Sequence, residues 1–260
     1  MITSPRSLIA SEGSRSRTLA HLVLRLKNQN GILKAASLVS RHHVTILSGF
    51  HESSADSGTL WSFFVDMTDA DVSADKLAEE FSRQPFVLNA SIRANSLGFI
   101  ADSFHFPIRM GSRPVVMFSV DAMKNIFQHL KSMLGPKVAD VMIHQMDVSS
   151  GEGIYRGFEL QFGKEATREQ LEEFLHLVRA TGWGCETLAE LDSEASTARI
   201  KFANSVECPT NFSNSRAQSQ FIRGTYSAFF SGFFGKPVEA EEVHCVAKGD
   251  AVCEFLLKPR

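Results

Sequence analysis

The residues best suited to chemistry in this 260-residue chain are two cysteines near its end, Cys245 and Cys253. They flank the turn-forming run Lys248-Gly249-Asp250, so a β-hairpin would bring the two thiols together. Converging thiolates can bind one metal ion, and Zn²⁺ accepts sulfur, imidazole or carboxylate in a tetrahedral set of four ligands. Cys208 and His244 are candidates to complete the set. Cys208 is favoured, because His244 adjoins Cys245 on a strand and would point to the opposite face.

The low cysteine content bears on this hypothesis. Four cysteines are few for a disulfide scaffold of this length, so a reducing cytoplasm is the expected location. Clustered cysteines there are either metal ligands or plain core residues, since free cysteine is among the most buried residue types. Zinc would be structural, because no paired general base or open water position is evident, and a sulfur-rich site could also accept iron.

A second notable segment is an apolar helix predicted over residues 216–235. The chain contains 21 Phe against 2 Trp and 2 Tyr, and phenylalanine offers a large apolar area without a hydrogen-bonding group. Such a helix can belong to an ordinary core or can line an apolar ligand pocket that carries a few polar groups. The candidate pocket residues are Phe221, Tyr226, Phe229 and Phe230 on this helix, with His144 as a further polar group.

Several function classes lack support in the sequence. The formal net charge is −2, so no basic field favours nucleic acid, and no run of about 18 apolar residues predicts membrane insertion. There is no phosphate-binding loop, dinucleotide glycine fingerprint or nucleophile elbow. His105, His129 and His176 are expected on surfaces or satisfied edges.

The first 94 residues combine a lead-in with a regular alternation of patterns. Residues 1–17 are rich in Ser and Arg and are expected to be a disordered lead-in. The order β-α-β-β-α-β over residues 18–94 then predicts a ferredoxin-like domain. Its elements are expected at 19–27, 32–39, 44–50, 59–67, 73–81 and 86–92. Asn30 is expected to cap the first helix.

The turn Asn28-Gln-Asn-Gly31, followed by Ile32-Leu33, resembles the corresponding turn of ACT domains. In that family the turn lies where amino acids or other small effectors bind. The resemblance therefore implies that Asn30 and Gly31 contact an amino-acid-like effector. A dimerisation or packing module without ligand is the alternative.

Residues 95–260 are expected to form the second domain, because glycines and prolines interrupt the pattern after residue 94. Its first helix should carry a buried stripe of Val120, Met123, Phe127, Leu130 and Leu134. Further helices are predicted at 139–146, ending at Ser149–Gly153, and at 168–179. A hairpin at 185–203, the helix at 216–235 and a hairpin at 238–257 complete a mixed α+β fold.

Three motifs in this region, Gly224-Thr-Tyr226, Ser231-Gly-Phe-Phe-Gly235 and Glu242-x-x-Cys245 with Cys253-x-Phe255, resemble 4-vinyl reductase-type domains. The resemblance spans roughly residues 105–258. Relatives include effector-sensing domains of phenol- and toluene-responsive activators, a bacteriochlorophyll-synthesis accessory protein and, more distantly, TRAPP tethering subunits. It implies an apolar cavity between helices and sheet that holds a small hydrophobic or aromatic molecule.

The resemblance also implies a ligand set for the metal. Aromatic sensors of this type use Glu-x-x-Cys-x7-Cys with one further cysteine on the long helix. Glu242, Cys245 and Cys253 match three of these positions, whereas the fourth falls near Ser219. Zinc binding then depends on another ligand, for which Cys208 is the better candidate.

The expected function is a cytoplasmic small-molecule sensor. A hydrophobic or aromatic ligand would bind in the C-terminal domain and an amino-acid-like effector in the N-terminal domain. Homodimerisation is expected, and the signal would pass through a protein partner because no DNA-binding or ATPase module is present. The alternatives are an accessory protein in tetrapyrrole or aromatic metabolism, and an assembly or tethering protein.

Overall fold

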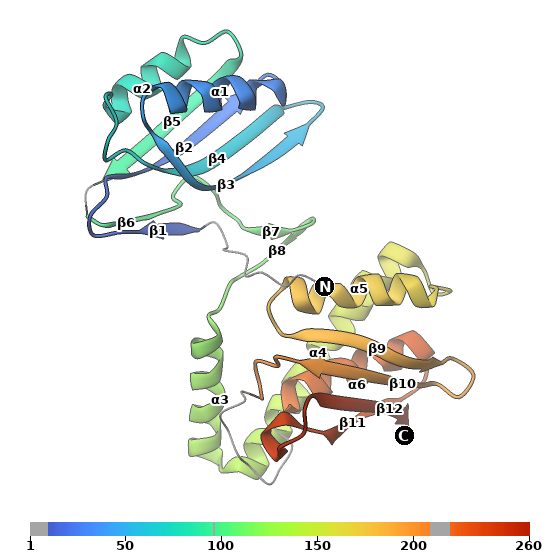
Figure 1. Ribbon diagram of the computed structural model, residues 1–260. Helices are drawn as coiled ribbons and strands as arrows, with labels where there is room; N and C mark the ends of the chain where they lie inside the picture. The colour runs from blue at the N-terminus through green and yellow to red at the C-terminus, as the bar shows by residue number, and fades with distance from the viewer. Residues whose placement is uncertain (1–9, 96, 209–218) are drawn as a thin grey trace. The chain divides into compact units, whose positions relative to one another are not determined.

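The computed structural model describes residues 10–95, 97–208 and 219–260, and the chain divides into two compact units between Val116 and Met117 (Figure 1). The division falls later than the expected boundary near residue 95. The reason is that β6 (Phe99–Ala101) returns to pair antiparallel with β1 (Ser11–Gly13). The prediction of a disordered lead-in over residues 1–17 is therefore wrong for Ser11–Gly13. A small ribbon of β7 (Arg109–Met110) and β8 (Arg113–Pro114) ends this unit.

The first unit has the predicted order of elements. These are β2 (Leu19–Leu26), α1 (Asn30–Arg41), β3 (Thr45–Ser54), β4 (Gly58–Asp66), α2 (Ala74–Ser82) and β5 (Val87–Asn95). The strands form one antiparallel sheet in the order β3-β4-β2-β5, which is the ferredoxin-like arrangement. Both helices cover the same face of this sheet (Figure 1).

The two faces of this sheet bury different side chains, because successive residues of a strand point to opposite sides. Leu22 and Leu24 belong to the core beneath the helices, together with Leu38 and Phe81. The residues between them face the other side, where Leu19, Phe64 and Ile100 form a small cluster. Figure 1 shows β1 and β6 on that side, away from α1 and α2.

The turn before α1 differs in detail from the prediction. The helix cap is Gln29, without a side-chain hydrogen bond, so Asn30 is the first helical residue and does not cap the helix. Instead, Asn28 Oδ1 accepts a hydrogen bond from the Asn30 backbone N–H at 3.1 Å. A Cβ on Gly31 would lie only 3.0 Å from Leu26 Cβ, so glycine allows α1 to start close against β2.

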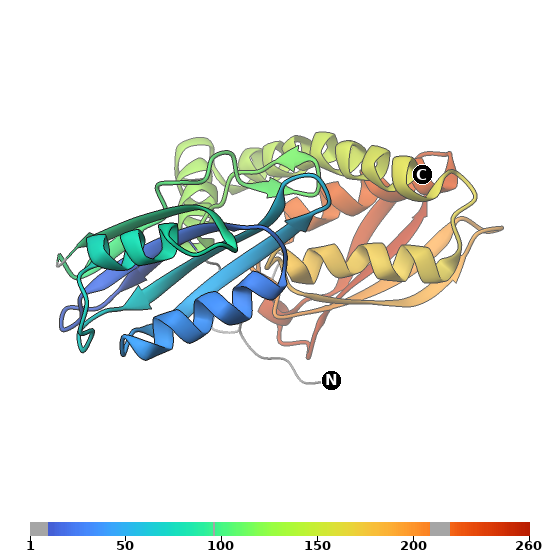
Figure 2. The same cartoon turned by 90° about the horizontal axis from the view of Figure 1, so that it is seen from above.

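The second unit is a mixed α+β domain, as predicted. Its elements are α3 (Val120–Leu134), α4 (Pro136–Phe162), α5 (Arg168–Ala180), β9 (Cys185–Asp192), β10 (Thr197–Ala203), α6 (Gln220–Phe234), β11 (Val238–His244), the 3₁₀ helix η1 (Val246–Lys248) and β12 (Cys253–Pro259). The antiparallel sheet has the order β11-β12-β10-β9. Helix α6 packs on α4 and on β11 (Figure 2). The expected start of this helix at residue 216 lies outside the described residues.

Helix α4 corrects the prediction that a helix ends at Ser149–Gly153. It continues through this segment because its glycines serve packing. A Cβ on Gly151 would lie 2.4 Å from the Thr225 carbonyl oxygen of α6, and a Cβ on Gly224 would lie 2.3 Å from that of His144. The missing side chains let the two backbones approach closely, which places α6 inside the domain.

Helix α3 also departs from expectation. Its apolar stripe was predicted to be buried, yet no residue of α3 is fully buried within the chain. Met123, Phe127 and Leu130 are half-buried, whereas Val120 and Leu134 are exposed. The stripe packs partly on α4 and leaves much of its apolar surface uncovered.

Among the described residues, no helix is both long and apolar enough to cross a membrane.

Candidate metal cluster and ligand-binding core

The four residues predicted as metal ligands lie together in the second unit. One ligand atom from each of Cys208, Glu242, Cys245 and Cys253 lies within 4.8 Å of all the others, and all four residues are buried. Cys208 follows β10, Glu242 belongs to β11, and Cys245 and Cys253 bracket the turn that joins β11 to β12. The chain therefore brings a distant cysteine to the hairpin that carries the other three residues.

The distances suit a tetrahedral site. The Cys208 and Cys245 sulfurs are 3.4 Å apart, and Cys208 Sγ lies 3.9 Å from Glu242 Oε1. Zinc–sulfur bonds of about 2.3 Å give sulfur–sulfur separations of about 3.8 Å in a tetrahedron. Three sulfurs and one carboxylate are acceptable zinc ligands, so the residues fit this ion with small adjustments.

The turn around the cysteines is held by backbone hydrogen bonds. The Cys245 backbone N–H donates to Asp250 Oδ2 at 2.7 Å, and the Val246 N–H points to Cys253 Sγ at 3.5 Å. His244 is exposed and lies 3.4 Å from Asp250, outside the cluster, in agreement with its expected orientation.

Ser219 explains how this cluster departs from the ligand set that the resemblance implies. Its hydroxyl lies 3.2 Å from Cys208 Sγ and donates to Glu242 Oε1 at 2.9 Å. Its backbone N–H donates to Glu242 Oε2 at 3.2 Å. Ser219 thus stands beside the cluster at the position where a cysteine was expected, and it orients the Glu242 carboxylate while Cys208 supplies the additional sulfur.

The protonation of the cluster depends on its occupant. The neighbouring Cys253 thiol and burial together raise the pKa of Cys208 far above its ordinary value. A divalent ion would have to displace such protons, because thiolates and not thiols bind metal.

Two further buried carboxyl groups adjoin the start of α6. Glu207 accepts the backbone N–H groups of Phe221 at 2.9 Å and Ile222 at 2.8 Å, so it caps the helix. Burial nevertheless raises the pKa of Glu207 to about 8. Burial also raises the pKa of Asp147 on α4 to about 7, partly offset by Ser150 and Thr225. Both groups are thus readily protonated near neutral pH.

The predicted ligand-contacting residues of α6 divide between two places. Tyr226, Phe229 and Phe230 are buried in the main core. Phe221 lies elsewhere, where its ring stacks on Trp183 with centroids 4.7 Å apart and approaches Phe127 at 5.6 Å. The prediction of one aromatic wall therefore joined residues that the helix separates by more than a turn.

His144 does not join Tyr226 as the second polar group of the core. It is half-buried, and burial together with the charges of Arg223 and Arg260 lowers its pKa. The polar residue that approaches Tyr226 is instead Glu186 of β9, which was not predicted from the sequence. Its position two residues before the buried Leu188 was the available signal, since both residues share a strand face.

Tyr226 is the most unusual residue of this core. Its side chain is almost completely buried, and its hydroxyl has no hydrogen-bond partner among the described residues. Phe255, Phe230 and Phe202 surround the ring at centroid distances of 5.6, 6.3 and 6.4 Å. Burial, with the nearby charge of Glu186, raises the pKa of Tyr226, so the hydroxyl keeps its proton and can donate it to an acceptor.

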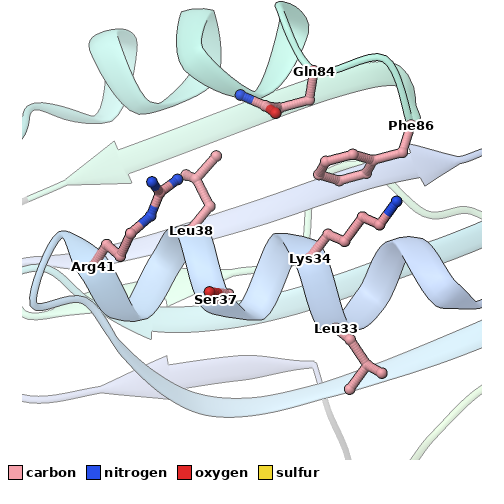
Figure 3. A pocket seen from close by; sticks show the side chains of 7 residues that line it. All are labelled: Leu33, Lys34, Ser37, Leu38, Arg41, Gln84 and Phe86. Atoms are coloured by element: carbon pink, nitrogen blue, oxygen red, sulfur yellow. The ribbon is translucent and has the colours of Figure 1, made fainter.

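The first unit contains a hollow of about 410 Å³ on α1 (Figure 3). It is lined by Leu33, Lys34, Ser37, Leu38, Arg41, Gln84 and Phe86. The Lys34 ammonium lies 5.6 Å from the centre of the Phe86 ring. Asn30 and Gly31, the predicted effector-contacting residues, do not line this hollow. Asn30 is exposed and Gly31 is buried against Leu26.

Comparisons with known proteins agree with the fold of the second unit. The vinyl-4-reductase domain family matches residues 198–259, which include β10, α6 and the β11–β12 hairpin. No curated protein matches the chain. The phenol-responsive sensory domain of the transcription activator PoxR, solved with phenol, is 18% identical with a TM-score of 0.50. The match covers 59% of this chain and 80% of that domain.

Two other solved structures are more remote. A vinyl-4-reductase family protein from Methanocaldococcus jannaschii is 16% identical, with a TM-score of 0.37, over 56% of this chain and 84% of that protein. A trafficking protein particle complex subunit 3 from Naegleria fowleri, covalently bound to palmitic acid, is 15% identical, with a TM-score of 0.41. That match covers 53% of this chain and 90% of the subunit.

Proposed function

We propose that this chain is a small-molecule sensor whose C-terminal unit binds a small aromatic or hydrophobic molecule that carries a hydrogen-bonding group. The observation that carries the proposal is the buried Tyr226 hydroxyl, which has no partner among the described residues. An unsatisfied buried polar group costs about 1–3 kcal/mol, and a ligand that supplies the missing hydrogen bond recovers this free energy. The vinyl-4-reductase domain match and the fold shared with a phenol-responsive sensory domain support the same conclusion.

The aromatic surroundings determine the class of ligand. Rings of Phe202, Phe230 and Phe255 offer edges and faces to a planar apolar molecule, and Tyr226 supplies a single polar contact. Glu186 adds a buried carboxyl group near that hydroxyl, with a pKa raised by burial and opposed by Arg179. A phenol, which can both donate and accept a hydrogen bond, fits this combination.

The chain offers a matched pair of variants for the test, because it has only two tyrosines, Tyr155 and Tyr226. Phenol binding should be measured by calorimetry and thermal shift on the wild type, Tyr226→Phe and Tyr155→Phe. We expect Tyr226→Phe to weaken binding at least about tenfold, equivalent to about 1.4 kcal/mol. Tyr155→Phe should bind like the wild type, because the Tyr155 hydroxyl already donates to Glu159 at 3.3 Å.

The unliganded variants give an internal check. Removing an unsatisfied hydroxyl should leave Tyr226→Phe as stable as the wild type or more stable. Equal phenol affinity in all three proteins, or no thermal stabilisation of the wild type by phenol, cresols or related small aromatics in large excess, would reject the proposal.

We further propose that the Cys208, Glu242, Cys245 and Cys253 cluster holds a structural zinc ion. The buried sulfur-rich donor set and its separations support this assignment. In such a role the ion would tie the end of β10 to the β11–β12 hairpin and so anchor the start of α6 through Glu242 and Ser219. Tyr226 lies on the same helix, so metal and ligand would stabilise the same element.

We propose that the hollow on α1 receives the effector of the N-terminal unit. Leu33, Leu38 and Phe86 supply apolar surface, and Lys34 and Arg41 supply positive charge. This combination favours a small molecule with an apolar part and a carboxylate, such as an amino acid. Signal output would then pass through a partner protein.

Homodimerisation through α3 and α4 completes the proposal. The partly covered stripe of α3 continues onto α4, where Val138 and Val141 are 54% and 63% exposed. Met133 on α3 is 66% exposed. A second copy of the chain, presenting the same two helices, would cover this apolar surface.

A further inference from the structure

A second group of metal-ligating side chains lies in the N-terminal unit and is independent of the proposed sensing function. His21, Asp102 and His105 each place one ligand atom within 4.8 Å of the other two. His21 belongs to the central strand β2, and Asp102 directly follows β6. The group lies on the sheet face opposite α1 and α2, since His21 shares that face with Phe64.

The His21 imidazole is completely buried and held by its neighbours. Its ring stacks on Phe64 with centroids 4.3 Å apart, and its Nε2 lies 2.8 Å from the Ser62 hydroxyl. Nδ1 has no hydrogen-bond partner among the described residues and lies 3.7 Å from Asp102 Oδ1. If Nε2–H donates to Ser62, Nδ1 presents a lone pair toward Asp102. This pattern is typical of metal-binding histidines, whose other nitrogen is held by a hydrogen bond.

Asp102 and His105 form the more accessible side of the group. Asp102 Oδ1 accepts the backbone N–H groups of Phe104 at 2.9 Å and of His105 at 3.2 Å, which fixes the carboxylate. Asp102 Oδ2 lies 2.7 Å from His105 Nδ1. The Asp102 and His105 side chains are 15% and 24% exposed, so an ion could enter from this side.

The order Ser62, His21, Asp102 also suggests a nucleophile, base and acid, but two observations oppose a hydrolytic site. Ser62 is completely buried, which leaves no access for a substrate. The 3.7 Å separation of His21 Nδ1 from Asp102 Oδ1 is too long for the hydrogen bond that would orient such a base.

That same separation suits metal coordination. Bonds of about 2.0–2.1 Å from zinc to nitrogen or oxygen give ligand separations of about 3.4 Å in a tetrahedron. Burial lowers the pKa of His21 to about 4, although the Asp102 charge opposes this effect, so the imidazole is neutral as a metal ligand requires.

We propose that His21, Asp102 and His105 bind one divalent transition-metal ion, with zinc as the preferred class, and leave one coordination position open. Two imidazoles and one carboxylate select such ions over Mg²⁺ and Ca²⁺, which prefer all-oxygen sites. Binding releases the proton shared between His105 Nδ1 and Asp102 Oδ2. Arg93 lies opposite His21 in the sheet and donates to the Ala101 carbonyl oxygen. Its positive charge makes the Asp102 carboxylate indispensable for holding a cation.

The test is the number of Zn²⁺ ions bound per chain after equilibrium dialysis, measured by elemental analysis on protein purified without a metal-affinity tag. We expect His105→Ala and Asp102→Asn each to bind one equivalent less than the wild type. His51→Ala is the matched control, because His51 is an exposed histidine of the same unit, and it should bind as much as the wild type. The difference between these proteins does not depend on whether the cysteine cluster binds zinc or phenol binds at all.

A second measurement does not require variants to fold. Titration of the wild type with Zn²⁺ should shift the imidazole resonances of His21 and His105 in nuclear magnetic resonance spectra and leave those of His51 unchanged. Equal zinc content in wild type and His105→Ala, or His21 and His105 resonances that do not respond to Zn²⁺, would show that the three residues form only an internal hydrogen-bonding group.

Discussion

At the scale of single residues, burial determines what the reactive side chains of this chain can do. Cys208 illustrates the effect, because its thiol would be an inert core group if it were alone. Three other donor atoms within 4.8 Å turn the same thiol into part of a metal-binding group. Tyr226 shows the converse, since the aromatic core around it withholds the partner that its hydroxyl needs.

The metal proposal leads to a prediction at this scale. Protein purified without a metal-affinity tag should contain close to one equivalent of zinc at the cysteine cluster, and Cys253→Ser should lose it. Loss of a structural ion should also lower the midpoint of thermal unfolding, because the ion's binding free energy contributes to folding. Cys185→Ser is the control, since Cys185 lies outside the cluster.

Elemental analysis and calorimetry check this prediction. Less than about a tenth of an equivalent of any transition metal in the wild type would contradict the assignment. So would a Cys253→Ser protein that retains the metal content and thermal midpoint of the Cys185→Ser control.

His42 predicts a pH dependence of stability. Its Nδ1 lies 2.7 Å from Asp71 Oδ1 and its Nε2 lies 2.7 Å from Glu80 Oε2. The hydrogen bond to Asp71, reinforced by Glu80, raises the pKa of His42 above its unfolded value of 6.5. The folded state therefore binds the proton more tightly. The resulting stabilisation is complete below about pH 6.5 and disappears as pH rises through the higher folded pKa.

Urea unfolding of the wild type and His42→Gln at pH 5.5 and pH 8.5 measures this effect. We expect the variant to be less stable than the wild type at pH 5.5, by up to about 1 kcal/mol for a partly exposed ion pair. The difference between the two proteins should shrink at pH 8.5. A constant difference at both values would assign the His42 contribution to packing and not to charge.

At the scale of elements, the contact between α4 and α6 positions most of the candidate ligand-binding residues. Gly151 and Gly224 permit the close approach, and Glu207 holds the start of α6. A glycine inside a helix ordinarily weakens it, so Gly151 is retained for packing at a cost in helix propensity.

Two glycines of α4 therefore predict opposite effects. Gly151→Ala should destabilise the protein by about 1–3 kcal/mol, since its Cβ would collide with the Thr225 carbonyl oxygen at 2.4 Å. Gly153→Ala should stabilise it by about 0.5–1 kcal/mol, because the nearest atom to its Cβ is a flexible arginine end at 3.9 Å.

Denaturant unfolding of both variants provides the measurement. Equal effects of the two substitutions would mean that the α4–α6 approach is looser than described. The phenol affinity of Gly151→Ala should fall as well, since Tyr226 adjoins Thr225, the contact residue.

At the scale of the whole molecule, the uncovered surfaces of α3 and α4 predict self-association. Val141→Lys and Met133→Lys should each weaken dimerisation at least about tenfold, because burying one such side chain contributes about 1.5–3 kcal/mol. Leu160→Lys is the matched control, since Leu160 is 83% exposed near the far end of α4. Analytical ultracentrifugation over a concentration series measures the dissociation constants. A monomeric wild type at high micromolar concentration would contradict this prediction.

Much of the fold followed from local patterns. The alternation in β2 and the helical spacing in α1 and α2 depend on neighbouring residues, so they are legible in the sequence. The end predicted for α4 was wrong because Gly151 and Gly153 look like helix breakers until α6 is placed beside them. The stripe of α3 was read as buried because an apolar periodicity does not say whether the covering surface belongs to the same chain.

The sequence by itself determined the elements, the α+β class and three ligands of the cysteine cluster, since a hairpin brings Glu242, Cys245 and Cys253 together through short-range pairing. Only the tertiary structure decided that Cys208 completes the cluster, that Glu186 and not His144 approaches Tyr226, and that His21, Asp102 and His105 converge. These groups join residues that are far apart in the chain. Their meeting depends on how sheets and helices pack, and no local spacing encodes that.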